Sequence, residues 1–181
     1  MLPVFVIIAI ILIYLNRNEI LPVMTNSRTE RNLETLNPVF KEKLILFFDE
    51  VNKKGLPALT ITDSLRTPEE QQKLYNQGRT TRGAIVTNAK PWDSLHNYGM
   101  AVDCYQTADL QKGKLTAPTK EHAKIAIKYG IYWGGNFTRF KDLPHFEFTQ
   151  GLGSRAFIAK YKPQAIAGTL PKDANGKFIF K

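Results

Sequence analysis

The stretch SLHNYGMAVD, at residues 94–103, contains two residue types that bind metal ions well. His96 is one of only three histidines in the chain, and Asp103 follows it seven residues later. A turn at Gly99 would fold the chain back and let the two side chains meet, because glycine adopts backbone conformations that other residues avoid. A neutral imidazole and a carboxylate are good zinc ligands. Two ligands alone do not make a metal site.

A second stretch, KDLPHFEF, adds two candidates further along the chain. His145 could supply a third ligand, and Asp142 lies three residues before it. Catalytic zinc sites keep three protein ligands and leave one position for water, and a nearby carboxylate can act as the general base. His96, Asp103, His145 and Asp142 therefore match the inventory for metal-assisted hydrolysis. Two histidines and two aspartates occur in many proteins of this size. Their presence alone therefore leaves the alternative that they have structural roles and bind no metal.

The other candidate ligands are predicted to take no part in chemistry. His122 lies in TKEHAKIAIK, at the polar start of a predicted helix, where we expect it to be solvated. Cys104 directly follows Asp103, so on a strand it would point to the opposite face, as a small buried hydrophobic side chain. A single cysteine also excludes an intramolecular disulfide and a Cys-rich zinc site. A metal would be held by histidines and carboxylates.

Hydrophobic spacing and turn residues predict the elements that must position these side chains. Helices are predicted over residues 38–55, 67–76 and 119–129, with Pro or Thr at the first two starts and Gly after the last turns. Short strands are predicted over residues 58–62, 100–105 and 145–148, and a loop over 79–93. This pattern indicates an α+β fold, with a small mixed or antiparallel sheet, flanking helices and the metal in a cleft.

Composition divides the chain into four segments. Residues 2–15 are apolar and uncharged but shorter than the roughly 20 residues of a full membrane span. We therefore interpret 1–19 as a signal anchor or a segment like a signal peptide, with a buried strand or helix as the alternative. Residues 20–37 are predicted to be a linker, 38–150 the folded catalytic domain, and 151–181 a C-terminal extension packed on the domain or trailing from it.

The charge of the chain favours an anionic partner. The formal net charge is +9, and 43% of the 181 residues are hydrophobic, which suits a globular domain with a real core. Nucleic acid, anionic lipid and anionic cell wall would all be attracted to such a surface. The basic residues are scattered and lack an interleaved aromatic motif, so we expect no nucleic-acid partner. A solvated basic surface without a function remains the alternative.

Three motifs resemble one enzyme family. SLHNYGMAVD is similar to the Ser-x-His-x-x-Gly-x-Ala-x-Asp signature of the zinc peptidases that include D-alanyl-D-alanine carboxypeptidases and vancomycin-resistance dipeptidases. DLPHFEF resembles their second signature. SLRTPEEQQKLYNQGRT followed by GAIVTNAKP resembles the L-alanyl-D-glutamate peptidase branch, known from bacteriophage endolysins and related bacterial enzymes. The resemblance spans about residues 38–148, with the three motifs in the family's order.

The resemblance implies a role for each matching residue. His96, Asp103 and His145 would bind Zn²⁺, and Asp142 would be the catalytic base. Arg66 matches the family arginine that stabilises the polarised carbonyl oxygen, as suits a fixed guanidinium beside a developing oxyanion. The structural alternative for Arg66 is an ion pair with Asp63 or Glu69 at the start of the predicted helix.

Three further residues are candidates for supporting the site or the substrate. Ser94 would orient a ligand or the substrate, or only form a turn. Glu147 alternates with Phe146 and Phe148 on the predicted strand, and it would either contact a ligand histidine or face solvent. Trp133, in YWGGNF, would line or support the cleft.

Together these features predict a zinc endopeptidase that cuts peptidoglycan stem peptides, between L-Ala and D-Glu. A D-Ala-D-Ala carboxypeptidase or dipeptidase of the same superfamily is the first alternative, and a non-catalytic, membrane-tethered wall-binding protein is the second. The expected partners are the stem peptide, the anionic wall and a membrane bound through the N-terminal segment. We expect a monomer, membrane-anchored or exported, that acts in the periplasm or cell wall.

Overall fold

The computed structural model describes residues 27–180, so the apolar run and the predicted signal anchor at 1–19 lie outside the described residues. Its centre is a four-stranded antiparallel sheet in the order β1-β2-β4-β3. The strands are β1 (Leu59–Asp63), β2 (Ala101–Gln106), β3 (Tyr132–Trp133) and β4 (His145–Glu147). The predicted α+β class and the small sheet are confirmed. Among the described residues, no helix is both long and apolar enough to span a membrane.

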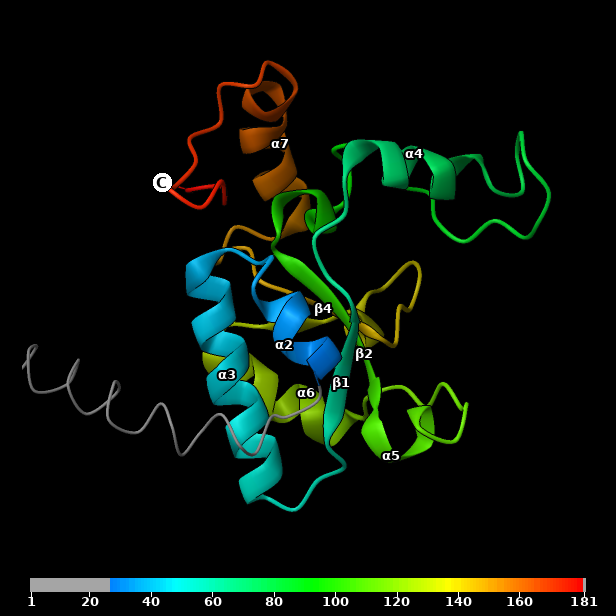
Figure 1. Cartoon of the computed structure of the whole chain (residues 1–181), viewed down its shortest axis with the longest axis vertical. Coiled ribbons are helices and arrows are strands. Elements are labelled where there is room, and N and C mark those ends of the chain that lie inside the picture. Colours follow the sequence, from blue (N-terminus) through cyan, green and yellow to red (C-terminus); the bar gives the residue numbers. More distant parts are fainter. Residues whose placement is uncertain (1–26, 181) are drawn as a thin grey trace, which may run out of the picture.

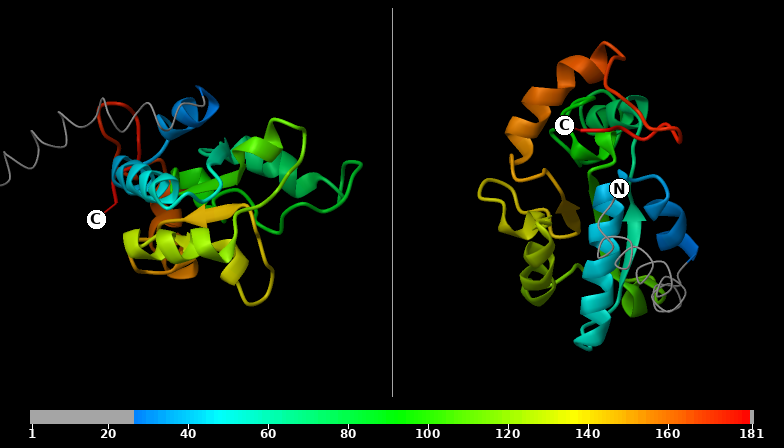
Figure 2. Two further views of the ribbon diagram at one scale, coloured as in Figure 1. Left: turned by 90° about the horizontal axis from the view of Figure 1, so that it is seen from below. Right: turned by 90° about the vertical axis from the view of Figure 1, so that its left-hand side faces the viewer.

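Helix α3 (Pro38–Lys53) covers one face of this sheet (Figures 1 and 2). Its N-cap Asn37 accepts hydrogen bonds from the N–H groups of Val39 and Phe40, at 3.0 and 3.3 Å. Its buried face packs against the strands through aromatic contacts such as Phe47 to Phe146, with ring centroids 5.2 Å apart. Every second residue of a strand therefore points toward α3 and into the core. The residues between them point to the other face of the sheet.

Helix α4 (Pro68–Asn76) begins and ends where the sequence predicts. The Thr67 hydroxyl accepts a hydrogen bond from Glu70 N–H at 3.2 Å, and the Glu70 carboxylate accepts one from Thr67 N–H at 2.8 Å. This reciprocal capping box fixes the start of the helix. The helix and the loop after it project from the body as an arm, coloured green in Figure 1.

Helix α6 (Lys120–Ala126) continues as the short 3₁₀ helix η3 (Ile127–Tyr129), as predicted. The predicted solvation of His122 is wrong, because its side chain is completely buried. One ring nitrogen lies 2.9 Å from the Pro57 carbonyl oxygen, and the other accepts a hydrogen bond from Thr119 N–H at 3.1 Å. His122 thus connects the start of α6 to the loop before β1. Both nitrogens of its buried imidazole have a hydrogen-bond partner, as buried polar groups require.

Several other elements were not predicted. Helix α2 (Ser27–Leu33) lies inside the predicted linker, so that prediction is wrong for the described residues from 27 onward. Helix α5 (Thr107–Leu110) follows β2, and the 3₁₀ helices η2 (Leu95–Tyr98) and η4 (Gly134–Asn136) lie before β2 and after β3. Helix α7 (Ser154–Ile166) lies in the C-terminal extension.

The C-terminal extension is part of the core. Phe180 is 8% exposed and packs on Phe157 and Tyr161, with ring centroids 4.9 Å away in each case. Tyr98, which ends η2, also contacts Phe157, at 5.7 Å between centroids. The extension therefore braces the segment that carries His96.

Replacing Phe180 by Ala is expected to lower the free energy of unfolding by about 3 kcal/mol, because it removes a buried ring from this cluster. Phe140→Ala is the matched control, since Phe140 is 68% exposed and should change stability by less than about 0.5 kcal/mol. Chemical denaturation of both variants measures the difference. Equal stabilities would show that the extension does not brace the fold.

Candidate metal centre

The three predicted ligands converge from three elements. His96 comes from η2, Asp103 from β2 and His145 from β4. His145 Nδ1 lies 3.2 Å from Asp103 Oδ1 and 3.3 Å from His96 Nε2, and His96 Nε2 lies 3.5 Å from Asp103 Oδ1. One ligand atom from each residue lies within 4.8 Å of the others. A single ion can therefore be held by all three.

Local structure explains why they meet. Gly99 ends η2 with φ 66°, and its N–H donates to His96 O at 3.2 Å, which forms the turn predicted from the sequence. Asp103 and His145 are directly paired across the antiparallel strands β2 and β4. Directly paired residues project from the same face, so both side chains point away from the α3 face. Cys104, next in sequence, is fully buried, as predicted.

The outward nitrogens of both imidazoles also have partners. His96 Nδ1 lies 2.7 Å from the Ser64 carbonyl oxygen, and His145 Nε2 lies 3.3 Å from Glu147 Oε2. If both outward nitrogens carry the proton, the inward ones present lone pairs to the centre. Such acceptors orient metal-binding histidines in known sites. Two oriented imidazoles and one carboxylate fit the ligand set of zinc.

The charges of the cluster favour a cation. Burial alone would lower the pKa of His145, but hydrogen bonds with Asp103 and Glu147 raise this pKa to about 10. Burial opposes ionisation of Asp103, yet hydrogen bonds with His145 and His96 hold its pKa well below the usual range. The centre therefore attracts positive charge, which a metal ion would supply in place of the proton.

Glu147 is buried, with 5% exposure, so the solvent-facing alternative is wrong. Its second oxygen accepts a hydrogen bond from the Ser154 hydroxyl at 2.5 Å, which links the start of α7 to β4. Ser154 was not identified as a candidate from the sequence.

We expect Glu147→Gln to weaken zinc binding by about 10- to 100-fold, since a neutral amide is a weaker hydrogen-bond partner for the His145 imidazole than a carboxylate. Zinc-chelator competition measures this, and an unchanged affinity would assign Glu147 to packing alone.

Asp142 lies in the loop before β4 and is partly buried. Its carbonyl oxygen accepts from His145 N–H at 3.2 Å, and its N–H donates to Gly134 O at 3.0 Å. A Cβ at position 134 would lie 2.4 Å from Asp142 O, so glycine is required there. Burial, followed by repulsion from Asp103, raises the pKa of Asp142, while His145, His96 and Arg66 act in the opposite direction. Its carboxyl group therefore lies within electrostatic reach of the cluster.

Arg66 lies at the edge of the cluster. It forms the ion pair with Asp63 that the sequence left as an alternative, and its Nη2 is also 4.0 Å from Asp103 Oδ2. Its Nη1 donates to Gln71 Oε1 at 2.8 Å. Gln71 is fully buried and was not identified from the sequence. These partners fix the guanidinium beside the candidate metal ligands. This position fits both roles expected from the sequence, stabilisation of the carbonyl oxygen and a structural ion pair.

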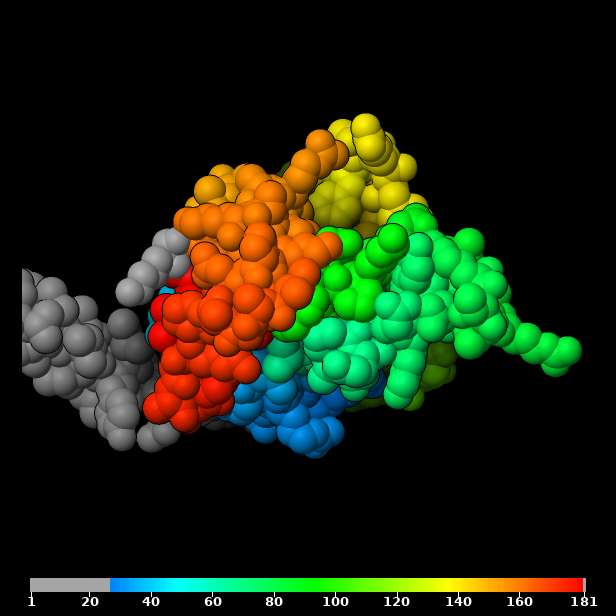
Figure 3. Space-filling model, turned by 90° about the horizontal axis from the view of Figure 1, so that it is seen from above, coloured from blue at the N-terminus to red at the C-terminus, as the bar shows by residue number. Residues whose placement is uncertain are grey.

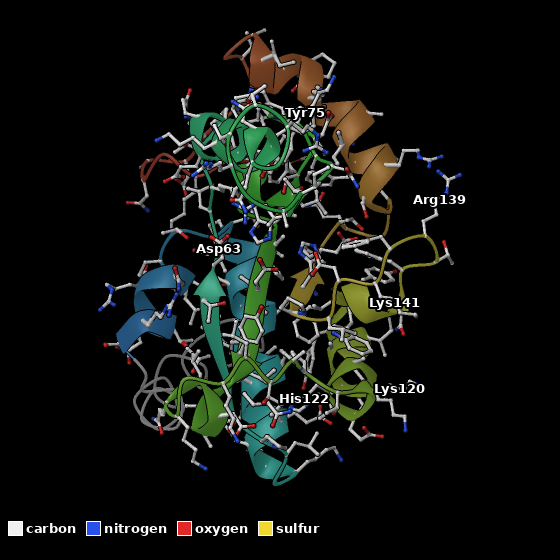
Figure 4. The ribbon with its side chains drawn as sticks, turned by 90° about the vertical axis from the view of Figure 1, so that its right-hand side faces the viewer. Asp63, Tyr75, Lys120, His122, Arg139 and Lys141 are labelled. Atoms are coloured by element: carbon white, nitrogen blue, oxygen red, sulfur yellow. The ribbon has the colours of Figure 1, made fainter. Side chains whose placement is uncertain are left out.

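The remaining candidates lie at the margins of the centre. Ser94 precedes η2, and its side chain makes no capping hydrogen bond there. Trp133 is buried, and its Nε1–H donates to the Leu143 carbonyl oxygen at 2.7 Å. Trp133 thus supports the loop that carries Asp142. Figure 4 shows the face from which this loop and Lys141 project, with Asp63 on the other side of β2.

The chain is also similar to known proteins. A family described as D-alanyl-D-alanine carboxypeptidase matches residues 87–148, which contain all three candidate ligands. The peptidoglycan L-alanyl-D-glutamate endopeptidase CwlK of Bacillus subtilis is 38% identical over 124 residues, which cover 62% of this chain and 72% of CwlK.

Two solved structures are also similar. The LdcB LD-carboxypeptidase has a TM-score of 0.51 at 16% identity, covering 71% of this chain and 64% of that one, which supports the fold alone. The Serratia marcescens L-Ala D-Glu endopeptidase ChiX has a TM-score of 0.48 at 20% identity, covering 69% of this chain and 89% of that one.

Proposed function

The chain belongs to the M15-type family of peptidoglycan peptidases, and from this we propose that it is a zinc endopeptidase that cuts stem peptides between L-Ala and D-Glu. The convergence of His96, Asp103 and His145 on one point is the observation that carries the proposal. The bond specificity is supported by the similarity to CwlK, whose name states that activity.

Zinc held by the three ligands would supply a Lewis acid that polarises the scissile carbonyl group and acidifies water. Asp142 would take the proton from the attacking water and return it to the leaving amine. Its raised pKa makes it a stronger base than an ordinary aspartate. This carboxyl group is partly buried, which limits competition from bulk solvent.

Arg66 would donate hydrogen bonds to the carbonyl oxygen as negative charge develops on it. Its hydrogen bond to Gln71 and its ion pair with Asp63 hold the guanidinium in place before substrate arrives. A group that is already oriented needs little reorganisation during the reaction.

Arg66→Lys is expected to lower kcat by about 10²- to 10³-fold, because an ammonium cannot reproduce the planar fork of donors. Zinc content and melting temperature should stay near those of the wild type. Steady-state kinetics on a stem peptide provide the measurement. A variant with full kcat would leave Arg66 only its structural ion pair.

Product analysis of digested peptidoglycan tests the proposed bond. Mass spectrometry should find cleavage between L-Ala and D-Glu, and a chelator should abolish it. The carboxypeptidase alternative predicts loss of a terminal D-Ala instead, and the wall-binding alternative predicts zinc binding without any product. Either outcome would replace the proposal.

We also propose that the protein acts outside the cytoplasm, where its substrate lies. The uncharged run at residues 2–15 supports export or anchoring through residues 1–19. Fractionation of cells that express the full chain or a chain lacking residues 1–19 tests this. An identical distribution of the two forms would contradict a targeting role for the segment.

A further inference from the structure

The outward nitrogens of the two candidate ligand histidines are held in different ways. His96 Nδ1 faces a backbone carbonyl oxygen, that of Ser64, at 2.7 Å, and the main chain fixes the position of this acceptor. His145 Nε2 instead faces a side-chain oxygen, Glu147 Oε2, at 3.3 Å. A glutamate has three side-chain torsion angles, and the last of them is only weakly restricted. The orientation of His145 therefore depends on what holds Glu147.

Ser154 holds the other oxygen of this carboxylate. Its hydroxyl group donates a hydrogen bond to Glu147 Oε1 at 2.5 Å, and among residues 27–180 it is the only hydrogen-bond donor to that oxygen. Glu147 is 5% exposed, so water is a poor replacement for this donor. Removing the hydroxyl group would leave a buried carboxylate oxygen without a partner, which costs free energy and lets the group turn away from His145.

The position of Ser154 is itself fixed by the fold. Ser154 is the first residue of α7, directly after Gly153. The Gly153 N–H donates to Thr149 Oγ1 at 3.1 Å, and the Gly153 carbonyl oxygen accepts from Phe157 N–H at 2.9 Å. Thr149 and Phe157 are both completely buried. The turn that carries Ser154 is therefore anchored to the core on both of its sides.

The rest of the C-terminal extension keeps α7 in place. The Phe157 ring packs on Phe180, with ring centroids 4.9 Å apart, and Figure 3 shows the red end of the chain against the orange α7. Lys162 lies near the other end of α7, and its Nζ is 2.5 Å from Asp93 Oδ1, in the loop before η2. Helix α7 is thus attached to the body at its start and near its end. Its first residue can therefore hold Glu147 in one orientation.

We propose that Ser154 is a positioning residue of the metal centre, whose hydroxyl group holds Glu147 so that His145 Nδ1 points at the bound ion. Ser154 contacts neither the ion nor the substrate, and it acts on the affinity for zinc through Glu147 alone. The inference rests on the zinc site of the proposed function. It deepens that function, because it makes the start of α7 a part of the metal centre.

Zinc affinity, measured by chelator competition without substrate, tests this role. S154A should raise the dissociation constant for zinc by about threefold to tenfold, less than loss of the Glu147 carboxylate, because Ser154 lies one hydrogen bond further from the ligand. S154T and S154V have nearly the same shape and differ in the hydroxyl group. S154T should stay within about twofold of the wild type, whereas S154V should behave like S154A. T169V is the control, since it removes an exposed hydroxyl group from the same extension and should leave the affinity unchanged.

A double-mutant cycle separates this role from a purely structural one. In the E147A background, S154A should change the zinc dissociation constant by less than about twofold, because the residue through which Ser154 acts is already gone. A contribution of Ser154 to the stability of α7 alone would persist in that background. Melting temperatures of the metal-free variants show that each of them is folded.

Three results would contradict the inference. S154A could bind zinc as tightly as the wild type, S154A could weaken binding equally with and without Glu147, or S154T could lose as much affinity as S154V. The proposed function fails separately, if the wild type binds zinc but cleaves no stem peptide, because the affinity cycle is measured without substrate. If the wild type binds no zinc, both the proposed function and the role of Ser154 are wrong.

Discussion

Asp142→Asn should lower kcat on a stem peptide by about 10²- to 10⁴-fold, the usual contribution of a general base. Asparagine has nearly the same shape but cannot accept the proton from water. The backbone bonds of Asp142 to His145 and Gly134 do not involve its carboxyl group, so the loop should keep its conformation. Zinc content should therefore remain at about one ion per chain. Stopped assays and metal analysis on the same preparation measure both quantities.

Asp49→Asn is a suitable control for this variant. Asp49 is on α3, on the opposite side of the sheet from the metal ligands, and its carboxylate pairs with Lys53 at 2.7 Å. Its replacement should leave kcat unchanged. Hydrolysis by the Asp142 variant at the wild-type rate would remove Asp142 from the mechanism and require another base.

His145→Ala should abolish both zinc binding and hydrolysis. The change removes one of three ligands and leaves Asp103 and Glu147 without their shared imidazole partner. We expect the affinity for zinc to fall by more than the roughly 10- to 100-fold that loss of a supporting residue causes. Isothermal titration with zinc and metal analysis of the purified variant measure the loss.

The third histidine provides the matched control. His122 is buried but belongs to the join between α6 and the loop before β1. His122→Gln should reduce stability by about 1–3 kcal/mol, through lost buried hydrogen bonds, while zinc still binds. Unchanged zinc stoichiometry in the His145 variant would remove His145 from the ligand set.

The features that could be predicted from the sequence are those determined by neighbouring residues, such as helix starts and turns. The start of α4 follows from Thr67, Pro68 and Glu70, which satisfy the first N–H groups of a helix by themselves. The turn at Gly99 follows from the need for a positive φ angle. The convergence of the ligands was predicted from the family motifs, because spacing alone does not show that β2 and β4 are neighbours.

The features that were missed depend on partners distant in sequence. His122 looks solvated in its polar helix, and only the Pro57 carbonyl oxygen explains its burial. In α7, Phe157, Tyr161 and Ala165 form a buried stripe at intervals of four residues, which was a usable helical signal. Pro163 lies inside that helix, and Pro, Gly and Asn-Gly turn signals occur in the segment, so no helix is predicted from the sequence within the C-terminal extension. Ser154 gains its role only through contact with β4.

Zinc titration of the metal-free protein tests the central claim most directly. Hydrolysis of a stem peptide containing the L-Ala–D-Glu bond should be absent without metal and should rise linearly with added zinc. It should reach its plateau at about one zinc ion per chain, because His96, Asp103 and His145 form one site. Full hydrolysis by the metal-free protein, or no hydrolysis at any zinc level, would contradict the account.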